Sequence, residues 1–78
     1  MIDPETVTLE TVNAAYKRID QFRNSADAAA RLCAQAMLKN DTETASRFAK
    51  RYQNHLASAE ALRTEIRTAA AKKFGTLS

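Results

Sequence analysis

Apolar residues recur along the first half of the chain with the seven-residue repeat of helices that pack side by side. Val12, Ile19, Ala26 and Cys33 are each seven residues apart, and an apolar residue follows three positions after each of them. This spacing places both sets on one face of an α-helix, at the a and d positions of a heptad repeat. We therefore expect one helix over about residues 4–38.

The start of this helix carries two competing signals. Asp3 offers a capping carboxylate, Pro4 suits the first helical position, and Glu5 adds an acid where the helix dipole favours negative charge. These residues predict a start near residue 4. Thr8 is a competing N-cap, because the β-branched residues that precede it are poor helix formers.

A polar pair in the middle of the segment leaves an alternative open. Ser25 is a suitable N-cap and Asp27 a suitable acid for a first turn, so a break at Asn24-Ser25 would give a three-helix bundle. A break usually resets the heptad register, whereas here the pattern runs straight through from Ile19 to Ala29. One continuous helix is our expectation, and the three-helix bundle is its alternative.

A short polar stretch then separates two helical segments. Asn40 tolerates the left-handed conformation that ends a helix, and Asp41 or Thr42 can cap the next one, which predicts a turn at about residues 39–41. The second apolar stripe predicts a helix over about residues 42–74. Its first turn holds an acid with a base four residues later, its last turn holds two lysines, and a glycine follows its end.

The short turn forces the two helices to run antiparallel. The sequence therefore predicts an all-α fold, a coiled-coil-like helical hairpin that forms a single domain over residues 1–78. Many of the seam positions are alanine, which lets helices approach closely, so we expect thin, tight packing at Ala26 and Ala29 of the first helix and at Ala57 and Ala61 of the second.

Composition supports this class. One glycine and one proline among 78 residues are too few for the turns of a β-rich fold. The single cysteine excludes a disulfide within the chain, no secretory signal is visible, and the longest run without charge is far shorter than the roughly 18 apolar residues that span a bilayer. We expect a cytoplasmic protein that does not enter the membrane.

A lone hairpin leaves apolar surface uncovered. The apolar stripe of the first helix is wider than one neighbouring helix can cover, and chains this small seldom obtain more than about 3 to 5 kcal/mol from one core. We therefore expect association, either by dimerisation into a four-helix bundle or by packing on the helices of a protein partner. The residues predicted to carry it are large and apolar: Tyr16, Ile19, Phe22, Leu32, Met37, Phe48, Tyr52, Leu56 and Ile66.

Candidate chemistry is sparse. Cys33 lies at an a position, where a core thiol is expected, and His55 is the single histidine. One cysteine and one histidine cannot supply the three protein ligands that even an open zinc site needs. The only glycine is Gly75, which excludes a glycine-rich phosphate loop. The sequence therefore predicts no enzyme activity, no metal and no cofactor.

Positive charge gathers in the second helix. The segment up to Asn40 is neutral, so the formal net charge of +3 lies in the rest of the chain, where Arg47, Lys50 and Arg51 share an outer face. This patch is a candidate contact for phosphate or for an acidic partner. Arg63 and Arg67 lie toward the apolar side and are predicted at the rim of an interface.

Two functional hypotheses follow. The first is a non-enzymatic protein–protein interaction module, such as an adaptor, co-chaperone or accessory factor, that acts through self-association or through helix packing on a partner. The second is a small nucleic-acid-binding accessory protein that uses the basic patch. No diagnostic motif assigns the chain to a family.

Overall fold

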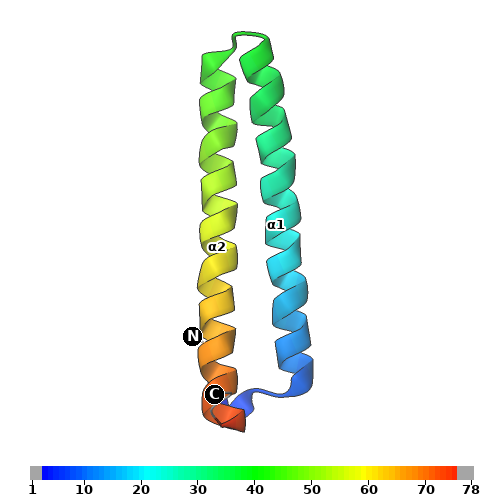
Figure 1. Cartoon of the computed structure of the whole chain (residues 1–78), viewed down its shortest axis with the longest axis vertical. Coiled ribbons are helices and arrows are strands. Elements are labelled where there is room, and N and C mark those ends of the chain that lie inside the picture. Colours follow the sequence, from blue (N-terminus) through cyan, green and yellow to red (C-terminus); the bar gives the residue numbers. More distant parts are fainter. Residues whose placement is uncertain (1–2, 76–78) are drawn as a thin grey trace.

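The computed structural model describes residues 3–75 and contains two long helices that pack side by side (Figure 1). Helix α1 spans Leu9–Leu38 and helix α2 spans Thr42–Phe74, and the two run antiparallel in a molecule of 51 × 22 × 15 Å. No strand occurs within the described range. The predicted all-α helical hairpin is confirmed.

The start of the first helix differs from our main expectation. Pro4–Thr6 forms only a short 3₁₀ helix, η1, which Asp3 caps by accepting a hydrogen bond from the Glu5 backbone N–H. Val7 is extended, and α1 begins after Thr8, whose hydroxyl accepts a hydrogen bond from the Thr11 N–H at 3.2 Å. The predicted start near residue 4 is wrong because the β-branched residues after Glu5 leave the helical conformation, and the competing Thr8 cap forms instead.

The segment before α1 closes the open end of the hairpin. Figure 1 shows η1 beside the final turns of α2, joined to the start of α1 by a short extended segment. Val7 is almost completely buried, and the Lys73 ammonium donates to the Glu5 carbonyl oxygen at 3.4 Å. The N-terminal segment therefore covers the end of the seam that the turn leaves open.

Helix α1 runs without interruption through Asn24 and Ser25, so the three-helix alternative is wrong. The turn at the other end follows the prediction. Asn40 has a φ of 59°, in the left-handed region, and the Asp41 N–H returns to the Ala36 carbonyl at 2.9 Å. The Asp41 carboxylate then caps α2 by accepting a hydrogen bond from the Thr44 N–H at 3.2 Å.

Hydrogen bonding at this cap affects the acidity of Asp41. Bonds from the Thr44 side chain, and next from its backbone, lower the pKa of the Asp41 carboxyl, with smaller contributions from the charges of Arg47 and Lys39. The charged carboxylate is therefore the form that the folded hairpin stabilises.

The seam between the helices is built largely from alanine. Its buried residues are Val7, Ala15, Ile19, Ala26, Ala29, Ala36, Ala45, Ala59, Ile66 and Ala69. The larger ones lie toward the open end, where Ile19 and Ile66 pack with Val12, Phe22 and Leu62. Toward the turn the buried positions are alanines alone.

Ala26 and Ala29 are buried in the seam, as expected, but the expectation for the second helix is wrong. Ala57 and Ala61 are exposed, and Ala59 between them is buried. Two residues correspond to about 200° around an α-helix, so the positions on either side of Ala59 face away from the seam.

Candidate functional site

One long face beside the seam carries exposed apolar side chains. Exposed residues follow each other at seven-residue spacing on α1, each immediately after a d position of the heptad: Leu9, Tyr16, Arg23, Ala30 and Met37. We call this surface the e face, after their heptad position. Three large apolar side chains on it are exposed to 74% at Leu9, 44% at Tyr16 and 64% at Met37.

The half of the e face near the turn holds an apolar groove. It has a volume of about 210 Å³ and is lined by Ala30, Cys33, Ala34, Met37, Ala49 and Tyr52. Apart from the sulfurs and the Tyr52 hydroxyl, these side chains offer hydrocarbon surface only. The Cys33 thiol donates to the Ala45 carbonyl oxygen at 3.3 Å, which keeps it directed toward α2. The groove suits apolar side chains from a partner.

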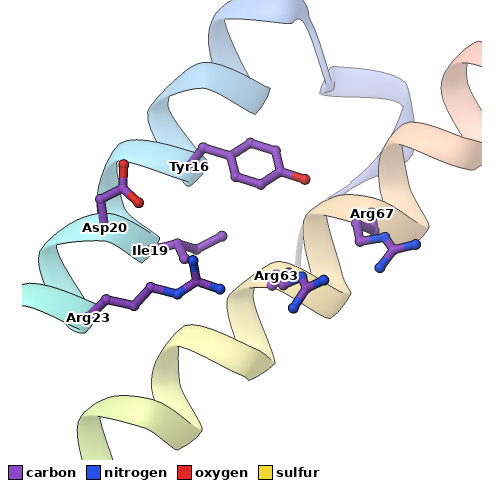
Figure 2. Close-up of a pocket in the computed structure, with 6 residues that line it drawn as sticks. All are labelled: Tyr16, Ile19, Asp20, Arg23, Arg63 and Arg67. Carbon is purple, nitrogen blue, oxygen red and sulfur yellow. The ribbon is translucent and has the colours of Figure 1, made fainter. Parts of the chain in front are cut away.

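The half of the e face near the open end holds a charged groove (Figure 2). This arginine groove has a volume of about 500 Å³ and is lined by Tyr16, Ile19, Asp20, Arg23, Arg63 and Arg67. Figure 2 shows the Tyr16 ring reaching from α1 toward α2, and the Arg63 and Arg67 guanidinium groups lying side by side on α2. Three positive charges and one negative charge line the groove, which leaves a net formal charge of +2.

The charges in the arginine groove are poorly compensated. Arg63 lies 3.5 Å from the Glu60 carboxylate, whereas within residues 3–75 Arg23 and Arg67 have no carboxylate within 4.0 Å. Arg63 and Arg67 are also four residues apart on one helix, where like charges disfavour the helix by a few tenths of a kcal/mol. Within that range neither Arg23 nor Arg67 forms an ion pair, although the Asp20 carboxylate lines the same groove.

Arginines on the opposite flank of the seam are engaged differently. The Arg18 guanidinium lies 5.2 Å from the centre of the Phe22 ring, and that of Arg51 lies 5.4 Å from the Phe48 ring, both within cation–π range. A third groove on this flank, near the turn, includes Leu32 and Phe48. The arginines there cover aromatic surface of their own helices.

The predicted association residues fall into three groups. Ile19 and Ile66 are buried between the two helices, with exposed fractions of 2% and 1%. Partly buried positions along the seam are Phe22, Phe48, Tyr52 and Leu56. Tyr16, Leu32 and Met37 are exposed, with Tyr16 and Met37 on the e face and Leu32 on the opposite flank. Their role in association stays a prediction. The exposed group, and Tyr52 where it lines the apolar groove, can contact another protein without unfolding the hairpin.

The predicted basic patch is spread along the outer surface of α2. Arg47 pairs with Glu43 at 3.1 Å, as the four-residue spacing predicts, Arg51 covers Phe48, and Lys50 is exposed. The structure therefore gives two of the three cations a contact within their own helix. Phosphate contact by this patch stays a prediction.

Arg23 is the site residue that sequence reasoning missed. Arg63 and Arg67 are singled out above as an interface rim, and the structure brings both into the arginine groove with Arg23 from the other helix. The available signal was position, because Arg23 lies seven residues after Tyr16 and seven before Ala30 on the flank that widens the apolar stripe. No sequence pattern indicated a role for Arg23 beyond its contribution to the net charge.

Two further searches of residues 3–75 bear on function. No group of three or more histidine, cysteine, aspartate or glutamate side chains is close enough to hold a metal ion. Neither helix in the described range is apolar enough over a sufficient length to cross a membrane. Comparisons with family models, with curated proteins and with solved structures find no match to this chain.

Proposed function

We propose that the chain is a non-enzymatic protein–protein interaction module that packs the e face of its hairpin against a helix of another molecule. The observation that carries this proposal is the exposure of Leu9, Tyr16 and Met37 on one face while the seam beneath buries mostly alanine. The hairpin buries little large apolar surface of its own, and a third or fourth helix on the e face would bury the remainder.

The shape of the face supports a helical occupant. The two grooves follow one another along the hairpin, on the same heptad flank of α1, so a helix laid along it meets both. Helices that bind in such grooves present apolar residues at three- and four-residue spacing. Packing against an existing two-helix seam reproduces the geometry of a helical bundle.

The test is a binding selection on the folded chain. The probe is a displayed library of amphipathic helices with a fixed stripe of leucine and alanine and with glutamate or lysine at each flanking position. Size exclusion with light scattering over a hundredfold concentration range shows whether the chain alone already associates. We expect helices to be selected by the chain or, if the e face pairs with itself, a concentration-dependent dimer.

Matched variants locate the binding surface. The double variant Tyr16→Glu/Met37→Glu places charge in both grooves and should abolish helix binding or dimerisation while retaining helicity. Leu38→Glu adds charge at a side chain that is 85% exposed and lies off the e face, so binding should persist. A stably folded monomer that selects no helix, or binding that survives the double variant, would contradict the proposed function.

A further inference from the structure

We infer that the partner helix is acidic at one end, with carboxylates that occupy the arginine groove while its apolar stripe fills the groove near the turn. This inference rests on the proposed function and adds the chemistry of the partner. Arg23, Arg63 and Arg67 reach this groove from both helices, and the folded chain leaves two of them without an ion pair in residues 3–75.

Two of the three arginines are spaced so that their charges disfavour their own helix. Arg63 and Arg67 repel each other across one helical turn, and Arg23 approaches them from α1 in the same groove. Guanidinium groups bind carboxylates through two parallel hydrogen bonds, a geometry that isolated lysines do not offer. The Tyr16 hydroxyl borders the groove as a further hydrogen-bond donor. Carboxylates are the ligands that these donors fit.

The arrangement of the e face argues against a second copy of the chain as the occupant. In a parallel pair of hairpins the arginine groove of one copy would face the arginine groove of the other, and like charges at an interface are unfavourable. In an antiparallel pair each arginine groove would face the apolar groove of the other copy, which would bury guanidinium groups without partners. An occupant that is apolar at one end and acidic at the other satisfies both grooves.

An acidic helix also fits better than nucleic acid. A nucleic-acid backbone carries phosphate charge along its whole length, whereas the apolar groove offers no charged side chain for phosphate to contact. The arginine groove also contains a single tyrosine, Tyr16. Proteins that bind single-stranded nucleic acid instead stack its bases on a series of aromatic side chains. The charged side chains of the e face therefore lie in the half near the open end, and a matching ligand carries its own charge at one end.

The experiment reads the charge preference of the selected helices position by position. In the library described above, glutamate should be enriched at least about fivefold over lysine at flanking positions near one end of the helix, and at the other end neither residue should be preferred. The triple variant Arg23→Gln/Arg63→Gln/Arg67→Gln should still select helices with the same apolar stripe, without the glutamate enrichment. The affinity of the best helix should fall roughly tenfold or more on this change.

A charge-matched control separates local from general electrostatics. Lys17→Gln/Arg31→Gln/Lys50→Gln removes the same number of charges from exposed positions off the e face and should leave the enrichment intact. Equal use of glutamate and lysine, enrichment along the whole helix, or loss of enrichment in this control would overturn the inference while leaving the proposed function standing. A thymidine oligonucleotide that displaces the helix from the wild type but not from the arginine triple variant would assign the groove to phosphate instead. If no helix is selected and the chain stays a folded monomer, the proposed function fails, whereas a dimer without helix selection would overturn this inference alone.

Discussion

The half of the hairpin near the turn (the turn half) and the half near its open end (the open half) bury different side chains in the seam. Beneath the arginine groove the seam contains Ile19 and Ile66, supported by partly buried large side chains, and Val7 covers its end. Beneath the apolar groove the buried positions are Ala26, Ala29 and other alanines. The same heptad pattern therefore gives one half with a core of branched side chains and another whose helices are held together by small ones.

This difference gives the two halves unequal shares of the folding free energy. Branched side chains in the open half remove the most apolar surface from water, so most of the folding free energy arises there. The turn half relies on the covalent turn, the Asp41 cap and close helix contact, and it leaves Met37 and Tyr52 available to a partner.

Removing a branched side chain from the open half gives the largest expected effect. Ile66→Ala should lower the free energy of unfolding by about 3 kcal/mol. The substitution leaves a cavity beside Ile19, and few neighbouring side chains are available to fill it. Urea denaturation followed by far-UV circular dichroism measures this loss. The control Leu38→Ala, at an exposed position, should change stability by less than about 0.5 kcal/mol. A loss at Ile66 below about 1 kcal/mol would contradict the division between the halves.

Enlarging an alanine in the turn half tests whether the helices pack tightly there. Ala29→Leu should destabilise the hairpin by about 1 to 3 kcal/mol, because the added atoms have no space between helices that approach over alanine. Ala28→Leu makes the same change one residue earlier at an exposed position and should be nearly neutral. The same denaturation measurement serves both variants. Equal stability of the two would mean that the alanine seam is not tightly packed.

The Asp41 cap gives the turn half a smaller, pH-dependent contribution. Because hydrogen bonds from Thr44 lower the pKa of Asp41 in the folded state, its stabilisation is fully present above the ordinary aspartate pKa and is lost as pH falls through the lowered value. Asp41→Asn keeps a capping side chain but cannot titrate. The melting temperature of the wild type should therefore exceed that of the variant most at neutral pH, and the difference should shrink in acid. A difference that does not change with pH would rule out this linkage.

The fold could be predicted because its main signals are local and periodic. The heptad continuing past Asn24 correctly favoured one helix over the three-helix alternative, and Asn40 correctly marked the turn. The start of α1 differs from the prediction because two caps compete there, and Val7 between them is extended and almost completely buried. No local pattern indicates that burial.

The candidate site was predictable only in part. The exposed flank with Tyr16 and Met37 follows from the width of the apolar stripe. The arginine groove depends on which residues of α2 lie opposite Arg23, and that pairing comes from the antiparallel register of the two helices. Sequence patterns place residues around each helix but do not align one helix against the other, so Arg63 and Arg67 were recognised as a rim without their third member.

The alanine seam has a consequence for how the two helices are aligned along their axes. Alanines that repeat along a helix are interchangeable, so sliding one helix by a heptad would often set alanine against alanine again. Such a surface specifies axial alignment weakly, in contrast to a seam with large or polar side chains at chosen positions. Alignment therefore depends on the interlocked Ile19 and Ile66 at one extremity and on the three-residue connection at the other. Lengthening that connection while shortening both isoleucines should yield a chain that remains helical but populates several alignments.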